Sequence, residues 1–305
     1  MKVLMISGDK NILIQGSEAE TRIALQRSQV DQLDVFVWPQ VHPLREIYKA
    51  ADLNRYDVVT AQDPFWRGLI AWRAARRMGA KLNLQIHTDL SAQPFWRRLL
   101  AYFLLRRADS VRVVSEKIRK QVQDRGVKAP IRVLPIYIDI SRFQNLKPEP
   151  HTQKTILWIG RFEPEKNPLS AVRILKEVRA DGIDAKLIML GTGTLESAIR
   201  KLAGSLPIEL PGWQNPESYL QIADVVLCTS KHESWGASIL EALAAGVPVV
   251  SPDIGIAKEA GAIVVPRSDL GTMVIRVLNS GQQGELKISL LSAEEWMKRW
   301  KETLV

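Results

Sequence analysis

Short apolar runs alternate with longer stretches of helical periodicity along most of the chain. In the first half the runs cover residues 2–7, 33–38, 56–61, 82–87, 110–114 and 131–138. In the second half they recur at 155–160, 187–190 and 224–230, and again after residue 248. Because strands joined by helices pair in parallel and are covered on both faces, the pattern predicts an α/β protein with a Rossmann-like first domain.

Residues 144–153 interrupt this alternation. Pro148 and Pro150 lie there among charged residues, a composition typical of a linker. The chain has 305 residues and is 46% hydrophobic, which is enough for two domains with a core each. We therefore expect a first domain at 1–143, a linker at 144–153 and a second domain from 154 onward.

Residues 231–253 carry most of the candidate chemistry. An alanine- and leucine-rich helical stretch begins after Gly236 and ends at Gly246, which is typical of a helix C-terminus. The first N–H groups of a helix have no partner inside it and attract anions. A candidate phosphate site is therefore formed by the amides of Ala237, Ser238 and Ile239.

Two glutamates flank this helix start. Glu233 lies in the preceding loop and Glu241 about one turn inside the helix. A carboxylate beside a phosphate site repels the phosphate unless it accepts hydrogen bonds from neutral hydroxyls, such as those of a sugar or ribose. Each glutamate taken alone is more often a solvated surface residue, so the prediction depends on finding both beside Gly236.

The net positive charge of the chain comes from its first half. Residues 1–150 contain 25 Lys and Arg against 15 Asp and Glu, whereas residues 151–305 contain 17 against 18. This asymmetry indicates either an anionic partner of the first domain, such as membrane headgroups or an acidic acceptor, or simply a basic soluble surface. Nucleic acid is not expected, because no nucleic-acid-binding motif is present.

The remaining composition favours a cytoplasmic protein. Cys228 is the single cysteine, so an internal disulfide is excluded, and the N-terminal apolar run is too short for a signal peptide. No apolar stretch reaches the roughly 18 residues of a spanning helix. We also find no cluster of metal-ligating residues and expect no metal.

Two segments, 61–77 and 91–107, resemble each other, with Trp66 and Trp96 at equivalent positions. The middle of the second segment is apolar on all sides, and arginine pairs bracket it. Such a helix is either buried in the core or lies in a membrane interface with its arginines at headgroup level. The core interpretation is favoured, because packing against the sheet explains it without a membrane.

The pattern Glu233-x7-Glu241, followed by AL-AAG-PVV, resembles a segment of the family 4 glycosyltransferases, which have the GT-B fold. The segments GR-x4-KN at 160–167, AD-x-V-x-VVS at 108–115 and VLPIYIDISRF at 133–143 resemble further parts of that family. The resemblance implies two Rossmann-like domains with parallel sheets that face a cleft. It also implies that 1–143 binds the acceptor, that 154–284 binds the nucleotide sugar, and that a helix in 285–305 returns to the first domain.

The resemblance assigns roles to the second-domain residues. Glu233 would contact the hydroxyls of the donor sugar and Glu241 the ribose, while Arg161 and Lys166 would bind the donor phosphates. Gly191 would border the nucleotide base. The family often has Phe at the position of Trp235, which should serve equally well as an aromatic wall.

The resemblance also assigns first-domain residues. His87 matches a histidine placed near the transferred sugar, Asp89 is a weaker candidate for positioning the acceptor, and Gly16 belongs to a glycine loop that faces the donor diphosphate. The chain departs from the family at Ile136 and Tyr137, where Asn and Gly are usual. Contacts made by those two residue types are therefore not expected here.

The resemblance implies a retaining, metal-independent hexosyltransferase that needs no cofactor. Its donor would be a UDP-sugar or GDP-sugar, and its acceptor a hydroxyl of a glycan, a lipid or a small molecule in cell-surface glycan or glycolipid assembly. A location in the cytoplasm or at the inner membrane face follows. Two alternatives remain open: a sugar-nucleotide epimerase or hydrolase, and a non-catalytic GT-B module that binds membranes or polyanions.

Overall fold

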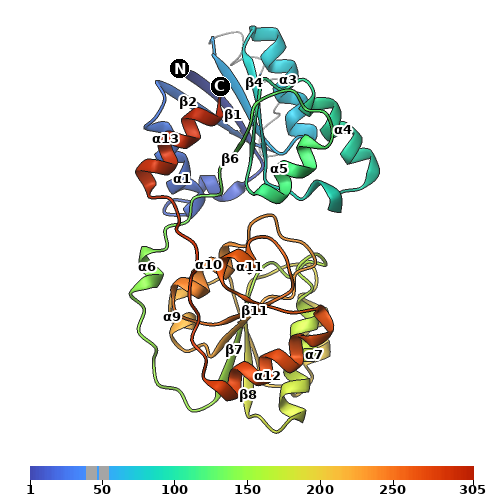
Figure 1. The fold of residues 1–305 in the computed structure, drawn as a ribbon, viewed down its shortest axis with the longest axis vertical. Coiled ribbons are helices and arrows are strands. Elements are labelled where there is room, and N and C mark those ends of the chain that lie inside the picture. Colours follow the sequence, from blue (N-terminus) through green and yellow to red (C-terminus); the bar gives the residue numbers. More distant parts are fainter. Residues whose placement is uncertain (39–46, 48–54) are drawn as a thin grey trace. The chain divides into compact units, whose positions relative to one another are not determined.

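The computed structural model describes residues 1–38, 47 and 55–305, and the chain divides into two compact units (Figure 1). Unit 1 comprises Met1–Ile138 and Leu290–Val305, and unit 2 comprises Asp139–Ser289. Each unit is built on a six-stranded sheet with parallel pairing throughout. The α/β fold class predicted from the alternating pattern is confirmed.

The sheet of unit 1 has the strand order β2-β1-β3-β4-β5-β6. Its strands are β1 (Lys2–Ser7), β2 (Gln32–Val37), β3 (Val58–Gln62), β4 (Lys81–Ile86), β5 (Ser110–Val113) and β6 (Ile131–Val133). The central strands are buried almost end to end, as expected for a parallel sheet covered on both faces. The described helices of this unit are η1 (Lys10–Leu13), α1 (Glu18–Arg27), α3 (Trp66–Met78), η2 (Leu90–Ala92), α4 (Phe95–Leu105), α5 (Glu116–Gln123) and α13 (Ala293–Thr303).

The sheet of unit 2 has the order β12-β11-β10-β7-β8-β9. Its strands are β7 (Lys154–Ile159), β8 (Ala185–Leu190), β9 (Ile208–Gly212), β10 (Val225–Leu227), β11 (Val249–Ser251) and β12 (Ile263–Val264). The helices are α6 (Ser141–Gln144), α7 (Pro168–Ala180), α8 (Glu196–Ala203), α9 (Glu217–Gln221), α10 (Ala237–Ala244), α11 (Ala257–Ala260), η3 (Arg267–Asp269) and α12 (Leu270–Ser280). The core lies between β7, β8, β10 and helices α7 and α12.

Helix α13 is the last element of the chain and belongs to unit 1 (Figure 1). Trp296 and Trp300 are buried in a cluster with Val3 and Met5 of β1. The indole N–H of Trp296 donates to the carbonyl of Pro135 over 2.8 Å. The N- and C-terminal segments therefore share one core, although all of unit 2 lies between them in the sequence.

The apolar run at 131–138 is a strand only as far as Val133. Beyond it, the carbonyls of Leu134 and Pro135 accept hydrogen bonds from the guanidinium of Arg112, at 3.0 and 2.8 Å. Pro135 has no N–H to donate to a strand partner. These two features replace sheet pairing with side-chain bonds and shorten the expected strand.

Helix α4 does not fit the favoured core interpretation of its sequence. Only Ala101, Leu104 and Leu105 of this helix are fully buried, whereas Phe95, Trp96, Leu99 and Phe103 are exposed. The expectation of burial on all sides was wrong because the sheet and helix α3 cover a single face. None of the helices in the described part of the chain has the length and apolar composition needed to cross a membrane.

Candidate functional site

The candidate site of unit 2 lies at the point where the strand order reverses. The chain passes from β7 to β8 and β9 on one side, and then returns to β10 on the other side of β7. The loops that follow β7 and β10 are therefore neighbours at the carboxyl edge of the sheet, where open α/β sheets bind ligands. A hydrogen bond of 2.8 Å from Lys231 N–H to the Glu165 carbonyl joins these two loops.

Lys166 and Glu233 form an ion pair across these loops, between Lys166 Nζ and Glu233 Oε1. Both side chains are mostly buried, with 21% and 14% of their surfaces exposed. The hydroxyl of Ser230 donates to the same carboxylate oxygen over 2.8 Å. The structure thus brings together two predicted site residues that are 67 positions apart. Glu233 Oε2 accepts no hydrogen bond from the described part of the protein.

Thr229 fixes the backbone that carries Lys166. Its hydroxyl oxygen lies 3.0 Å from the carbonyl oxygen of Lys166 and 2.9 Å from that of Asn167, and it accepts the indole N–H of Trp158 over 2.9 Å. Asn167 stands before helix α7 in a left-handed conformation, with φ of 52°, and its side chain makes no capping hydrogen bond. The hydroxyl of Thr229 thus ties the two loops together.

Arg161 follows the carboxyl end of β7 and is more exposed than Lys166. Its Nη2 pairs with Glu165 Oε1 at 2.8 Å, and 61% of its side chain is exposed. Such an exposed pair is weak, so Arg161 can change partners at little cost. It is available to an anion that enters beside Lys166.

Gly236 begins helix α10 with φ of 105°, a backbone conformation that glycine adopts without strain. Among the described residues, the N–H groups of Ala237 and Ser238 have no hydrogen-bond partner, as the sequence predicts. Ile239 differs from the prediction, because its N–H donates to the carbonyl of Gly236 over 3.1 Å. The tight first turn therefore presents two amides rather than three.

Glu241 is buried, with 7% of its surface exposed, although it lies on helix α10. It is not the solvated surface residue that a single glutamate would suggest. A carboxylate is retained at such a position where hydrogen bonds or a ligand compensate for its desolvation.

Gly191 is required for the shape of this edge. A Cβ atom at this position would lie 1.9 Å from the carbonyl oxygen of Gly160, and its φ is 148°. The loop that it opens is held by Phe162 N–H, which donates to Thr192 over 2.9 Å, and by Thr194, which donates to Glu163 over 2.6 Å. Gly191 thus allows the loop after β8 to support the loop that carries Arg161.

His87, the candidate in unit 1, follows the carboxyl end of β4. Its backbone N–H donates to Asp63 Oδ1 over 3.1 Å, while its buried Nε2 atom has no partner within the described structure. Burial, together with the charges of Arg112 and Arg22, holds the pKa of His87 well below its ordinary value. The imidazole is therefore neutral at pH 7, and one ring nitrogen remains for a ligand or a water.

A cavity of about 20 Å³ lies beside His87, with room for about one water molecule. Arg22, Arg112 and Gln62 contribute to its lining. Burial lowers the pKa of Arg112 to about 9, and its guanidinium is held by Gln85 Oε1 at 2.7 Å as well as by backbone carbonyls. Asp9 also lines the cavity and pairs with Arg22 at 3.7 Å, so Arg112 is the cation beside the neutral histidine that has no acidic partner in this lining.

Asp63 is a residue of this edge that the sequence reasoning missed. It follows β3 with φ of 68°, which is uncommon for a residue other than glycine. Burial raises the pKa of its carboxyl, although hydrogen bonds from Thr88 and His87 and the charge of Arg67 oppose this effect. A short acidic residue placed between an apolar run and Pro64 is the signal that could have identified it.

Asp89 and Gly16 also lie in unit 1. Asp89 Oδ1 accepts hydrogen bonds from the Ser91 N–H at 2.9 Å and from Gln121 Nε2 at 2.9 Å. Much of the hydrogen-bonding capacity of this carboxylate is therefore used within the local fold. The N–H of Gly16 donates to Glu20 Oε2 over 3.2 Å, and the hydroxyl of Ser17 accepts from the Glu20 N–H. Gly16 thus takes part in capping helix α1.

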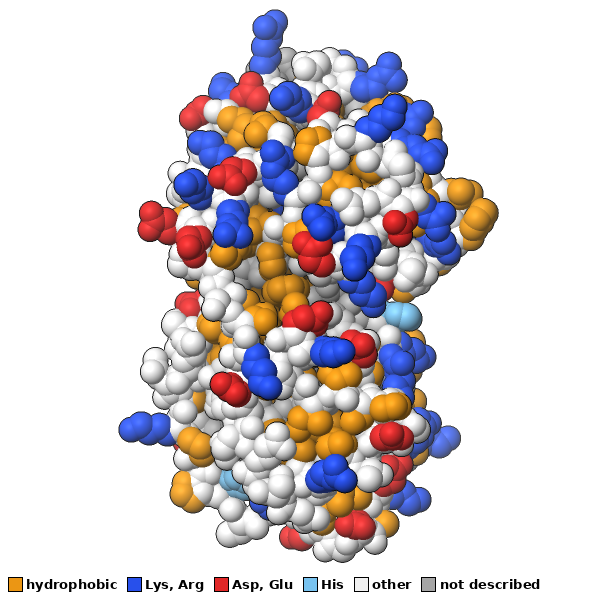
Figure 2. Space-filling view, in the orientation of Figure 1, with side chains coloured by type: hydrophobic (Ala, Val, Ile, Leu, Met, Phe, Trp, Pro, Cys, Tyr) orange, Lys and Arg blue, Asp and Glu red, His pale blue; other side chains and the backbone are white. Residues whose placement is uncertain are grey.

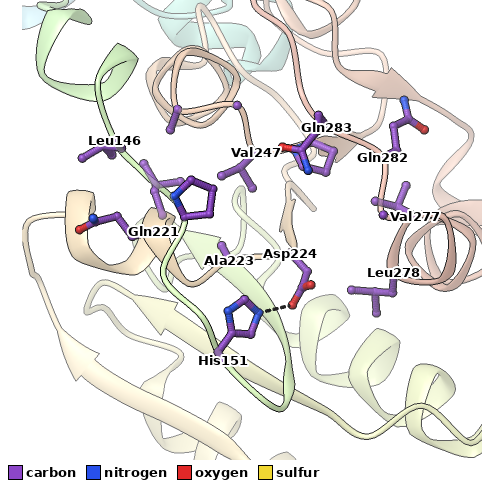
Figure 3. Close-up of a pocket in the computed structure, with 16 residues that line it drawn as sticks. Leu146, His151, Gln221, Ala223, Asp224, Val247, Val277, Leu278, Gln282 and Gln283 are labelled. Atoms are coloured by element: carbon purple, nitrogen blue, oxygen red, sulfur yellow. Dashed lines mark hydrogen bonds and ion pairs between the residues drawn. The ribbon is translucent and has the colours of Figure 1, made fainter.

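A second cavity, of about 130 Å³, lies at the opposite edge of the unit 2 sheet (Figure 3). Leu146 and His151 of the predicted linker line it, together with residues that precede β10 and β11. Figure 3 shows His151 pointing to Asp224, and its Nε2 lies 2.8 Å from Asp224 Oδ2. Because this edge holds the amino ends of the strands, we assign the cavity to the packing of the linker.

Within the residues that the structure describes, no three His, Cys, Asp or Glu side chains lie together in a way that could hold a metal ion.

Solved structures with the same architecture define the fold. The fold of HepE from Anabaena, determined in complex with UDP and glucose, matches with a TM-score of 0.73 over 100% of this chain and 99% of that chain, at 16% identity. Sucrose-phosphate synthase from Thermosynechococcus elongatus matches with a TM-score of 0.74 over 100% and 95% of the two chains, at 15% identity. The chain therefore has the GT-B fold, as predicted.

Family models identify the chain further. Residues 139–301 match the family described as glycosyl transferases group 1, and residues 17–142 match the one described as glycosyltransferase family 4. Because the first match covers more than half of the chain, the protein belongs to the group 1 glycosyltransferases.

Two curated relatives illustrate the range of this similarity. A GDP-mannose-dependent alpha-(1-6)-phosphatidylinositol dimannoside mannosyltransferase of Mycobacterium tuberculosis is 33% identical over 103 residues, which is 32% of this chain and 27% of that protein. The alpha-monoglucosyldiacylglycerol synthase of Streptococcus pneumoniae is 28% identical over 167 residues, which is 48% of this chain and 38% of that protein. The similarity thus spans well under half the length of either relative.

Proposed function

We propose that the protein transfers a hexose from a UDP-sugar or GDP-sugar to a hydroxyl of a lipid or glycan acceptor, with retention of anomeric configuration. The observation that carries this proposal is the Lys166–Glu233 ion pair beside the start of helix α10, at the switch point of the unit 2 sheet. This edge of the sheet offers the cations of Lys166 and Arg161 and the free amides of helix α10 to a diphosphate. It also offers a carboxylate oxygen of Glu233 to sugar hydroxyls.

Unit 2 is the donor-binding unit in this proposal. Lys166 and Arg161 pair with the diphosphate, and the N–H groups of Ala237 and Ser238 donate to it. Glu233 keeps its bond to Ser230 while its second carboxylate oxygen accepts from a sugar hydroxyl. Glu241, one turn further along the helix, accepts from the ribose.

The chemical demand is to stabilise the nucleoside diphosphate as it leaves. The bond from the anomeric carbon to the diphosphate oxygen breaks, and the acceptor oxygen forms a new bond to that carbon on the same face. The acceptor proton passes to the departing phosphate oxygen. Fixed cations and amides lower the barrier because they face the developing charge before the reaction begins.

Unit 1 supplies the acceptor side. His87 is neutral, so its Nε2 can exchange a hydrogen bond with a sugar hydroxyl without adding charge. Two of the relatives, a phosphatidylinositol dimannoside mannosyltransferase and a monoglucosyldiacylglycerol synthase, support a lipid acceptor. A location at the inner membrane face accords with such an acceptor.

The test is thermal unfolding of the purified protein with a panel of nucleoside diphosphates and nucleotide sugars. A ligand that binds only the native state raises the melting temperature. We expect a selective shift with UDP or GDP and their hexose derivatives, and sugar transfer to lipid extracts with the selected donor. Release of nucleotide at the same rate with and without acceptor would instead indicate a hydrolase. No shift with any nucleotide would refute the donor site.

A further inference from the structure

Helix α4 presents an exposed apolar face. Phe95, Trp96, Leu99 and Phe103 have exposed fractions of 72%, 55%, 54% and 40%. At about 100° per residue, these four positions fall within one arc of about 100° on the helix surface. The buried residues of α4 lie on the opposite side, so the exposed side chains form a continuous stripe along the helix.

The stripe continues onto helix α3. Trp72 of α3 meets Phe103 edge to face, with 5.6 Å between the ring centroids. Trp66 begins α3 with an exposed fraction of 59%. Because α3 and α4 follow the neighbouring parallel strands β3 and β4, Trp66 and Trp96 both lie toward the carboxyl edge of the sheet. We call the apolar stripe of α4, together with Trp66 and Trp72 of α3, the α3–α4 face.

Basic side chains border this face, and acidic residues are nearly absent from the segment that forms it. Residues 64–108 contain eight arginines and one lysine against a single acidic residue, Asp89. Asp89 is buried and bonded to Ser91, so it does not offset the exposed charge. In Figure 2, hydrophobic side chains project where Figure 1 draws α4, and Lys and Arg side chains border them.

Several of these arginines lie directly over the aromatic rings. The guanidinium carbon of Arg107 is 3.5 Å from the Phe103 centroid, and that of Arg76 is 5.5 Å from the Trp72 centroid. The hydrocarbon parts of these side chains can stay with the apolar surface while the charges reach outward. This combination of exposed tryptophan, phenylalanine and leucine with an arginine border matches the chemistry of a bilayer interface.

We propose that the α3–α4 face docks onto the surface of an anionic lipid bilayer. Trp66, Phe95, Trp96 and Leu99 enter the boundary between headgroups and acyl chains, and Arg73, Arg76, Arg106 and Arg107 pair with lipid phosphates. A second copy of the chain fits this face poorly. A two-fold contact would place the arginines against each other, and Asp89, the one acidic residue of the segment 64–108, is buried and cannot neutralise them.

Docking also orients unit 1. The tryptophans at the helix starts place the carboxyl edge of its sheet toward the lipid, and His87 follows a strand at that edge. If the proposed function holds, a lipid acceptor then reaches this edge without leaving the membrane. The docking itself requires neither donor nor acceptor, so it can fail or succeed independently of the transfer reaction.

The test is co-sedimentation of the whole protein with vesicles of phosphatidylcholine, with and without about one third phosphatidylglycerol. We expect binding to the anionic vesicles that weakens as salt increases. The variant Trp96→Glu/Leu99→Glu should lower the partition coefficient at least about tenfold. Both side chains are exposed, so its melting temperature should remain that of the wild type.

Unit 2 offers a matched control. Trp213 and Leu202 are also exposed, at 54% and 41%, so Trp213→Glu/Leu202→Glu adds the same charges at another surface. It should bind vesicles at about 80% or more of the wild-type level if the docking is confined to the α3–α4 face. A second variant, Arg106→Gln/Arg107→Gln, should lose binding to anionic vesicles and become less sensitive to salt.

Three outcomes would overturn the proposal. If the Trp96→Glu/Leu99→Glu variant binds vesicles as well as the wild type does, the face does not contact the lipid. An equal loss in the unit 2 control would show a nonspecific effect of charge. The third outcome concerns sedimentation velocity. If the wild type is a dimer, the Trp96→Glu/Leu99→Glu variant is a monomer and neither binds vesicles, the occupant of the face is a second copy of the chain.

Discussion

Replacing Lys166 with Met tests the donor site most directly. The ammonium of Lys166 is paired with Glu233, and both side chains are mostly buried. Loss of the cation removes a charge-assisted contact to the donor diphosphate, which contributes about 1.5–3 kcal/mol. We therefore expect the Kd for the preferred nucleoside diphosphate to rise by about tenfold to a hundredfold.

The same change should destabilise the ligand-free protein. Glu233 keeps the hydroxyl of Ser230 but loses its counter-ion. A fully buried pair broken on one side costs about 3–5 kcal/mol, and the partial exposure of this pair reduces the expected loss to about 1–2 kcal/mol. Thermal or urea unfolding measures this term, and isothermal titration calorimetry with UDP and GDP measures the affinity.

Two further variants separate these effects. Lys186→Met is the matched control, because Lys186 forms an ion pair with Glu209 at 2.9 Å elsewhere in unit 2. It should leave nucleotide affinity unchanged. The double variant Lys166→Met/Glu233→Gln should recover most of the stability but not the affinity.

The reasoning fails if Lys166→Met binds nucleotide within about twofold of the wild type. It also fails if Lys186→Met loses as much affinity. Full recovery of affinity in the double variant would show that Lys166 only neutralises Glu233 and does not bind phosphate.

Two other predictions concern unit 2. Gly191→Ala should displace the loop that carries Arg161, because the new Cβ would meet the carbonyl of Gly160. We expect about 2 kcal/mol or more of destabilisation and weaker nucleotide binding, and unchanged melting and titration curves would contradict this. The carbonyl of Glu149, followed by the carboxylate of Asp224, raises the pKa of His151 above its ordinary value. The protonated imidazole therefore stabilises the folded state below about pH 6.5, and this stability is lost as the pH rises through the higher folded-state pKa. For this partly exposed pair the contribution to the free energy of unfolding is about 1 kcal/mol or less. The melting temperature of the wild type should therefore exceed that of His151→Asn at pH 6 but not at pH 8.5. A constant difference across this pH range would contradict a stabilising role of the protonated imidazole.

Much of the fold followed from the spacing of apolar runs, since most runs have about the length of one strand and the intervals outside residues 39–54 hold helices. The motif at 231–253 correctly placed Gly236 before a helix that presents amides at its start. What the sequence could not provide were the partners of side chains. That Lys166 meets Glu233 depends on β7 and β10 being neighbours, which is a property of strand order.

The exposure of helix α4 could not be inferred for a related reason. A helix that is apolar on all sides reads the same whether one neighbour or several cover it, and here only one face is covered. Asp63 escaped notice because its significance depends on a backbone conformation and on burial. The missing partner of His87 Nε2 is likewise a feature of packing.

The burial of Trp300 beside Val3 and Met5 has a consequence for how the protein is made. A ribosome releases the chain from its first residue onward, so the β1 segment emerges long before α13 exists. Unit 2 is contiguous and its core needs no residue beyond Ser289, whereas the core of unit 1 stays partly uncovered until its final helix is available. Chains truncated after residue 289 should therefore contain a protease-resistant unit 2 and a unit 1 with part of its core exposed.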